Sequence, residues 1–234
     1  ISPALWYDYS VWKNIDFSKF SVPEFIAFRF CEAMKAFTSE SVRFSSSKLN
    51  VVFISNEVNK MKTVKDYVTS IPDFPEPGII FRDITSVIGD ADGLKLAIDQ
   101  MQEKLDGVEF DVIAGLESRG FLFGMPIAYN LGKPFIPVRK KGKLPRETVS
   151  ASFELEYGTA EIEIHKDDVK PGTRVVLIDD LIATGGTLNA AAQLFEQLGA
   201  SVVKIVCLLE LKGLNGRQAL GDHSIDTVIS YEGK

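Results

Sequence analysis

Short apolar runs alternate with helical stripes from about residue 61 to the end of the chain. Val175–Ile178 is an uninterrupted apolar run, and Val202–Leu209 is apolar except for Lys204, as expected for strands that are covered on both faces. Leu94, Ile98 and Met101 recur at helical spacing, which predicts an amphipathic helix. Strands that alternate with helices predict an α/β fold with a mostly parallel twisted sheet flanked by helices.

The remaining periodic segments extend this pattern. Apolar residues at three- and four-residue steps between Val64 and Ile71 predict a helical face there. Ala151–His165 alternates apolar and polar positions around Gly158, which predicts a β-hairpin. Further strands are predicted at Val112–Gly115, Pro134–Arg139 and Thr227–Tyr231, and further helices at Phe121–Leu131 and Leu188–Leu198.

Residues 1–60 differ from the rest of the chain in being rich in aromatic residues and serine. A helical stripe runs from Ala27 to Phe37, and Ser45–Ser47 indicates a linker. We therefore expect two parts, an N-terminal extension over residues 1–60 and a self-sufficient domain over residues 61–234. The role of the extension stays open. It also stays open whether this segment is disordered and whether it is a translation artefact.

Composition and charge argue against several classes of protein. The chain has 234 residues, a formal net charge of −6 and two cysteines. An acidic chain is a poor partner for nucleic acid, and no apolar run reaches the length of a membrane span. Cys31 and Cys207 have no metal-ligand spacing and are too few for a disulfide framework. We therefore expect a cytoplasmic protein that binds neither membrane nor nucleic acid.

The most informative segment is VVLIDDLIATGGT, residues 175–187. Asp179 and Asp180 follow a buried strand, and Ala183–Thr187 then opens a helix with small and hydroxyl residues. Ligands of open α/β sheets bind at the carboxyl ends of strands, and free backbone N–H groups at a helix start attract phosphate. Two carboxylates beside a phosphate-binding loop fit a sugar phosphate, because they can accept hydrogen bonds from its hydroxyls.

A second segment of the same kind is GLESRGF, residues 115–121. It also follows a predicted strand and opens a helix, and it supplies Arg119, a hydroxyl and backbone donors, which fit a second phosphate group. Two phosphate sites on neighbouring strands predict a substrate that is phosphorylated at both ends.

These motifs resemble those of the type I phosphoribosyltransferases. DDLIATGGT resembles the family's signature for 5-phosphoribosyl diphosphate (PRPP). PDFPEPGIIFRDIT, GLESRGFLFG, RKKGKLP and FELEYGTAEIEIHKD together resemble the adenine-specific branch, and the match runs from about Met61 to Glu232. The resemblance implies the family's sheet with a small hood and a flexible β-hairpin loop. It also implies transfer of 5-phosphoribosyl from PRPP to N9 of adenine, giving AMP and pyrophosphate in purine salvage.

For PRPP, the resemblance implies one role for each end of the molecule. The ribose hydroxyls would lie near Asp179 and Asp180, and pyrophosphate would lie against a cis peptide between Glu117 and Ser118. The cations that would neutralise pyrophosphate are Arg119, Lys140, Lys141 and Lys143, and the loop that would hold the 5′-phosphate comprises Ala183, Thr184, Gly185, Gly186 and Thr187.

For adenine, the resemblance implies a base that stacks on Phe81 and meets Leu181 on its other face. Backbone groups of Ile80 and Arg82 would read the edge of the base. Glu156 and Tyr157 would lie on a hairpin that closes over the site, with Glu156 as the candidate proton-transfer group. Catalysis would thus involve Glu156, Arg119, Asp179 and Asp180. The resemblance also implies Mg²⁺, held mainly by PRPP and pyrophosphate without a direct protein ligand, and a homodimer.

Two other functions stay open at this point. One is a related enzyme that acts on a 6-oxopurine. The other is a regulator that binds PRPP without catalysis and uses an added N-terminal segment to bind nucleic acid. Residues 1–60 carry few cations, balanced by acids, and form a poor phosphate-binding face. The GLESRGF and FELEY segments also favour an enzyme.

Overall fold

The computed structural model describes residues 41–43, 52–54, 62–155 and 158–233. The chain divides into two compact units, Ile1–Met61 and Lys62–Lys234. In the first unit the described elements are strands β1 (Ser41–Arg43) and β2 (Val52–Ile54), which pair antiparallel. The predicted helical stripe from Ala27 to Phe37 lies outside the described residues, as do Glu156 and Tyr157.

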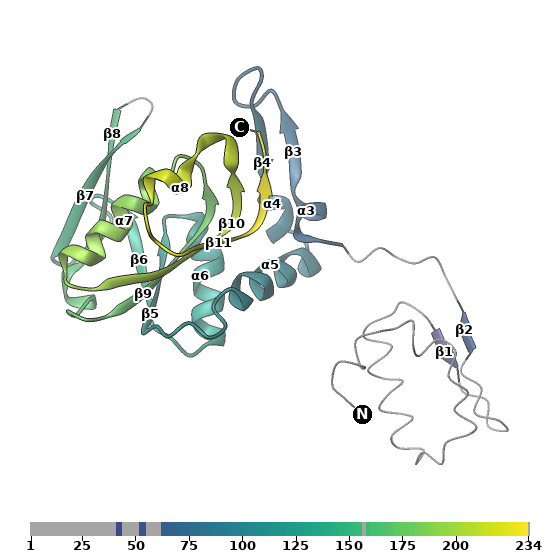
Figure 1. The fold of residues 1–234 in the computed structure, drawn as a ribbon, viewed down its shortest axis with the longest axis horizontal. Coiled ribbons are helices and arrows are strands. Elements are labelled where there is room, and N and C mark those ends of the chain that lie inside the picture. The colour runs from purple at the N-terminus through teal and green to yellow at the C-terminus, as the bar shows by residue number, and fades with distance from the viewer. Residues whose placement is uncertain (1–40, 44–51, 55–61, 156–157, 234) are drawn as a thin grey trace, which may run out of the picture. The chain divides into compact units, whose positions relative to one another are not determined.

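A seven-stranded sheet forms the centre of the second unit (Figure 1). Neighbouring strands from β11 to β6 run parallel, whereas β8 and β7 are antiparallel to their neighbours. This order confirms the predicted mostly parallel sheet with a hairpin. In spatial order the strands are β11 (Ile225–Tyr231), β10 (Ser201–Leu211), β9 (Arg174–Ile182), β5 (Val112–Leu116), β6 (Phe135–Lys140), β8 (Gly158–His165) and β7 (Thr148–Leu155).

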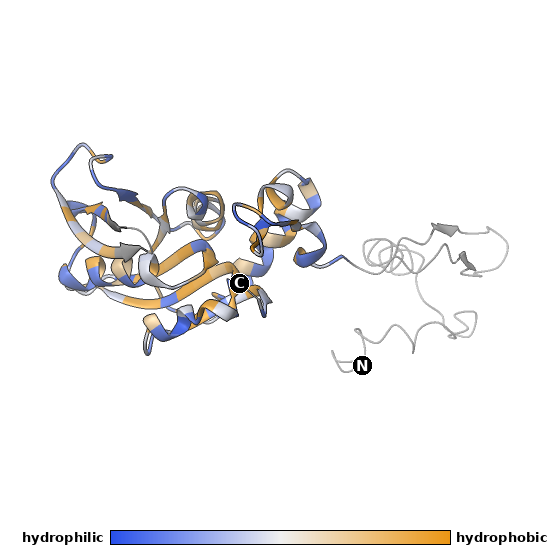
Figure 2. Cartoon of the chain, turned by 90° about the horizontal axis from the view of Figure 1, so that it is seen from above, coloured by the Kyte–Doolittle hydropathy of each residue, from blue (hydrophilic) through white to orange (hydrophobic). Residues whose placement is uncertain are grey.

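Helices cover both faces of this sheet, and alternate residues of a strand face different helices. Val175 and Leu177 belong to a core cluster with α7 (Gly186–Gln197). Val176 and Ile178 belong to a second cluster with α5 (Ala91–Glu103) and α6 (Arg119–Asn130). Burial on both faces explains the uninterrupted apolar run Val175–Ile178 within β9. The apolar colour accordingly concentrates on the central strands in Figure 2.

Short elements complete the unit. They are the helices α3 (Val64–Tyr67), α4 (Thr85–Ile88) and α8 (Gly216–Ala219), the 3₁₀ turns η3 (Lys166–Asp168) and η4 (Lys212–Leu214), and a two-stranded antiparallel sheet of β3 (Thr69–Pro72) and β4 (Ile80–Asp83). In the part of the chain that the structure describes, each helix is too short or too polar to span a lipid bilayer.

The helical face predicted between Val64 and Ile71 is wrong in its second half. The helix ends at Tyr67, and Ile71 pairs with Phe81 in the β3–β4 sheet. The hydroxyl of Ser86 explains the break, because it accepts from the backbone N–H of Thr69 at 2.9 Å and donates to the carbonyl of Tyr67 at 2.7 Å. A side chain from α4 thus takes the backbone groups that a longer helix would have paired.

Candidate active site

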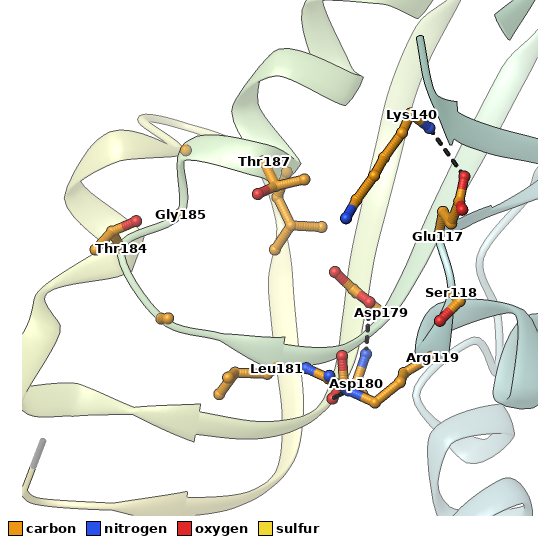
Figure 3. Close-up of a pocket in the computed structure, with 13 residues that line it drawn as sticks. Glu117, Ser118, Arg119, Lys140, Asp179, Asp180, Leu181, Thr184, Gly185 and Thr187 are labelled. Carbon is orange, nitrogen blue, oxygen red and sulfur yellow. Dashed lines mark hydrogen bonds and ion pairs between the residues drawn. The ribbon is translucent and has the colours of Figure 1, made fainter. Parts of the chain in front are cut away.

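A cavity of about 340 Å³ opens beyond the carboxyl ends of β5 and β9 (Figure 3). These strands are parallel neighbours, but α6 follows β5 on one face of the sheet and α7 follows β9 on the other. Such a reversal leaves a crevice between the two loops, where α/β proteins bind their ligands. The lining residues are Glu117, Ser118, Arg119, Lys140, Asp179, Asp180, Leu181, Ala183, Thr184, Gly185, Gly186, Thr187 and Leu188.

The loop Ala183–Thr187 forms one wall of this cavity and turns directly into α7. Gly185 has a φ of 81°, in the left-handed region, and a Cβ there would lie 2.3 Å from the carbonyl oxygen of Gly216. Both facts require glycine at this position. No side chain caps α7, so the N–H groups of its first turn remain available to an anion.

Asp179 and Asp180 line the floor of the cavity at the end of β9. Nε of Arg119 donates to Oδ2 of Asp180 at 2.5 Å, and the backbone N–H of Asp180 donates to Oδ1 of Asp179 at 2.9 Å. Asp180 is only 5% exposed, so its charge is compensated by the Arg119 guanidinium. Burial and the neighbouring Asp180 raise the pKa of Asp179 well above its usual value.

The opposite wall is built by Glu117 and Lys140. The carboxylate of Glu117 accepts from Nε and Nη2 of Arg139 at 3.1 and 3.3 Å, and from the backbone N–H of Lys140 at 2.9 Å. Burial opposes ionisation of Glu117, but these donors outweigh it and lower the pKa of Glu117. The Glu117–Ser118 peptide bond is cis, as the resemblance implied. The Lys140 side chain extends into the space between Glu117 and the Ala183–Thr187 loop (Figure 3).

Comparison with known proteins agrees with this geometry. Residues 88–230 match the family model of the phosphoribosyl transferase domain. Adenine phosphoribosyltransferase from Agathobacter rectalis is 70% identical over 174 residues, which cover 74% of this chain and all of the relative. The chain belongs to the adenine phosphoribosyltransferase family. The alignment length also places about a quarter of the chain outside the similarity.

Solved structures of this family share the fold. The crystal structure of adenine phosphoribosyltransferase from Thermoanaerobacter pseudethanolicus is 52% identical with a TM-score of 0.69, and the match covers 72% of this chain and 98% of that one. The enzyme from Trypanosoma brucei, in complex with AMP, pyrophosphate and ribose-5-phosphate, is 25% identical with a TM-score of 0.66. That match covers 71% of this chain and 77% of the other.

Some residues singled out in the sequence do not line the cavity. The Lys141 amine pairs with Glu161, and Lys143 is held by its backbone N–H, which donates to Glu163 at 2.9 Å. The segment Ile80–Arg82, assigned to adenine, lies on β4, and its Phe81 packs edge-to-face on Phe74 with 5.3 Å between ring centroids. Phe81 is 37% exposed, so part of this residue remains accessible to a ligand.

Arg139 and Leu188 are site residues that the sequence reasoning missed. Arg139 begins the RKKGKLP motif, so the motif itself was a signal, but only the structure pairs it with Glu117. Leu188 lies at the first turn of α7 and lines the cavity although it is 2% exposed. A helical stripe of apolar residues gives no indication that one member borders a site.

The cavity offers carboxylate oxygens to Mg²⁺, the ion that the family implies. Mg²⁺ usually keeps several waters and is bound through one or two carboxylates together with substrate phosphates. Within residues 62–155 and 158–233, no group of three acidic, histidine or cysteine side chains could hold a metal ion. Asp179 and Asp180 supply two carboxylates beside the anion-binding walls. The residues present therefore fit an ion that arrives with a phosphorylated substrate.

Proposed function

We propose that this chain transfers the 5-phosphoribosyl group of PRPP to N9 of adenine, releasing pyrophosphate and forming AMP. One observation carries the proposal beyond family membership: Glu117–Arg119 and Ala183–Thr187 line the same cavity from neighbouring strands. A single sugar phosphorylated at both ends can therefore contact both segments. Purine salvage is the role of this activity in the family.

In the proposed complex the 5′-phosphate lies on Ala183–Thr187, where α7 offers uncapped N–H groups. The ribose hydroxyls lie near Asp179 and Asp180, and pyrophosphate lies against Glu117, Ser118, Arg119 and Lys140. Lys141 and Lys143 are proposed to help neutralise pyrophosphate, and Lys141 can do so only if its amine leaves Glu161.

Charge development explains why these residues surround the sugar. When pyrophosphate leaves the anomeric carbon, positive charge grows on the ribose and negative charge grows on the leaving group. Carboxylates near the ring stabilise the first charge, while Arg119 and Lys140 stabilise the second. Mg²⁺, held mainly by the phosphate oxygens of PRPP, would supply further positive charge at the leaving group.

Adenine is proposed to stack on Phe81 and to be read by backbone groups of Ile80 and Arg82, with Leu181 on its other face. In adenine, N1 accepts a hydrogen bond from a backbone N–H and the amino group donates to a backbone C=O. A 6-oxopurine has a donor at N1 and an acceptor at C6, so it would leave both backbone groups without a partner. Glu156 is proposed to move the proton of the purine, and Tyr157 to help close the hairpin over PRPP, which excludes water.

A homodimer and a cytoplasmic location complete the proposal. Leu122, Met125 and Tyr129 are 43%, 51% and 86% exposed and lie on one face of α6. An exposed apolar stripe of this kind supports self-association. Cys207 is a free, buried thiol, which fits a reducing compartment. Analytical ultracentrifugation of the purified chain measures its molar mass in solution. A monomer's mass at micromolar concentration would refute the proposed dimer.

One assay tests the activity. The purified chain is mixed with PRPP, Mg²⁺ and one free purine base at a time, and nucleotide is detected by chromatography. AMP from adenine alone is the expected result. Product only from hypoxanthine, guanine or xanthine would replace adenine by a 6-oxopurine. No product with any base, together with tight PRPP binding and salt-dependent binding of nucleic acid, would replace the enzyme by a regulator.

A further inference from the structure

One buried carboxylate outside the cavity has no part in the proposed function so far. Glu163 lies on β8 and is only 4% exposed. Its partner across the strand pair is Arg139 at the end of β6, which places the two side chains on the same face of the sheet. Burying a carboxylate costs free energy unless hydrogen-bond donors compensate its charge. The donors that surround Glu163 therefore indicate which part of the structure it holds in place.

Those donors are mainly backbone groups of one loop. Residues 141–147 connect β6 to β7, and we call them the basic loop because their sequence is KGKLPRE. Oε1 of Glu163 accepts from the backbone N–H groups of Lys143 and Leu144, each at 2.9 Å. Oε2 accepts from the hydroxyl of Thr148 at 3.2 Å. Glu163 thus binds two successive amides in the middle of the loop.

The loop held in this way is joined to the wall of the cavity. Nη1 of Arg139 donates to the carbonyl of Lys143 at 3.4 Å, and the same guanidinium donates to Glu117. Glu117 in turn accepts from the backbone N–H of Lys140. A continuous set of hydrogen bonds therefore runs from Glu163 through the basic loop and Arg139 to the two residues that form the cavity wall, Glu117 and Lys140.

We propose that Glu163 is a positioning residue for the pyrophosphate end of the site. It fixes the backbone of the basic loop, which fixes Arg139 and through it the wall that contains Glu117 and Lys140. The proposal rests on the proposed function, because it assumes that this wall meets pyrophosphate. Glu163 does not contact the cavity itself, so its effect must appear as a change in anion binding and not as the loss of a reacting group.

Three variants separate the reach of the Glu163 side chain from its charge. Glu163→Gln keeps an oxygen that can accept from both amides but removes the charge. Glu163→Asp keeps the charge but draws the oxygens back from the amides. Glu163→Ala removes both. Glu161→Ala is the matched control, because Glu161 lies on the same strand and pairs with the Lys141 side chain, yet its carboxylate binds no loop amide.

Binding is measured by calorimetry with pyrophosphate plus Mg²⁺ and, separately, with ribose 5-phosphate, and KM values for PRPP and adenine are measured in the AMP assay. Glu163→Ala and Glu163→Asp should weaken pyrophosphate binding and raise KM for PRPP about tenfold, in keeping with lost hydrogen bonds to a charged group. Ribose 5-phosphate binding and KM for adenine should change by less than about twofold. Glu163→Gln should stay within about threefold of the wild type, and Glu161→Ala, which frees the Lys141 amine, should not weaken pyrophosphate binding by more than about threefold.

Three results would overturn the positioning role. They are unchanged pyrophosphate binding in Glu163→Asp and Glu163→Ala, an equal loss for ribose 5-phosphate, or the same loss in Glu161→Ala. If Glu163→Ala does not fold, pyrophosphate binding by Glu163→Gln and Glu163→Asp still tests the positioning role, because only Glu163→Asp should weaken it. A wild-type chain that makes no AMP but binds pyrophosphate would refute the proposed function while the binding contrast still tests Glu163. A wild-type chain that does not bind pyrophosphate would refute both.

Discussion

Replacing Gly185 with alanine should damage the phosphate loop for two separable reasons. The first is backbone strain, because Gly185 has a φ of 81°, and the left-handed region costs about 1–2 kcal/mol for a residue with a Cβ. The second is steric, because the new Cβ would lie 2.3 Å from the carbonyl oxygen of Gly216. Overpacking of this kind costs about 1–3 kcal/mol. We therefore expect Gly185→Ala to lower the free energy of unfolding by about 2–5 kcal/mol.

Two other glycines isolate these contributions. Gly172 has a φ of 84° with nothing within 4 Å of a built Cβ, so Gly172→Ala should show the strain alone, about 1–2 kcal/mol. Gly216 has no positive φ, but its Cβ would lie 2.3 Å from the carbonyl oxygen of Ala183, so Gly216→Ala should show the clash alone, about 1–3 kcal/mol.

Urea denaturation at pH 7 measures all three variants against the wild type. The free energy of unfolding should be lower for Gly185→Ala than for Gly172→Ala or Gly216→Ala. KM for PRPP should rise in Gly185→Ala and Gly216→Ala, which alter the loop, and stay at the wild-type value in Gly172→Ala. The reasoning is refuted if Gly185→Ala is no less stable than Gly172→Ala, because the clash with Gly216 would then contribute nothing.

Three more changes test the site. Arg119→Ala leaves the Asp180 carboxylate, which is 5% exposed, without its guanidinium, so we expect kcat in the AMP assay to fall by about 10²–10³. A loss below tenfold would contradict a catalytic role for Arg119. Lys140→Ala should raise KM for PRPP about tenfold but not KM for adenine, and equal rises would argue against contact with pyrophosphate. The raised pKa of Asp179 means that the folded protein binds a proton at this carboxyl more tightly than the unfolded chain does. The free energy of unfolding should therefore fall as pH rises above about 4. Urea denaturation at a series of pH values should show this decline for the wild type and not for Asp179→Asn. Parallel wild-type and Asn curves between about pH 4 and pH 8 would contradict the sign.

The sheet could be predicted because its apolar runs reflect two-sided burial. Val175–Ile178 is covered on both faces, as is typical of a strand in the middle of a parallel sheet, and the polar residues that follow lie at its carboxyl edge. The same reasoning brought GLESRGF and ATGGT together, since both follow neighbouring strands. Local pattern and global position agree in this sheet, which is why the predicted fold class is confirmed.

Contacts between distant residues could not be predicted in the same way. The end of α3 depends on the Ser86 hydroxyl, which binds the backbone of Tyr67 and Thr69 from another helix. The Lys141 amine pairs with Glu161 of the hairpin, so a basic run alone does not tell which cation faces the cavity. Glu163 occupies an alternating strand where an outward carboxylate would be ordinary, and only the fold places loop amides against it.

The ion pair between Arg119 and Asp180 bears on any effort to make this enzyme more heat-resistant. Only one partner is buried, because the Arg119 side chain is 50% exposed and that of Asp180 is 7% exposed. Transferring a charge such as that of Asp180 into a protein interior is expensive, and a well-packed apolar residue in its place is often neutral or favourable for folding when the partner charge is removed as well. Replacing Asp180 with an apolar residue and Arg119 with an uncharged polar residue is therefore a route to a more stable but inactive protein. At this pair, the side chains that favour substrate binding differ from the side chains that would favour stability. Variants selected for heat tolerance should therefore also be screened for activity.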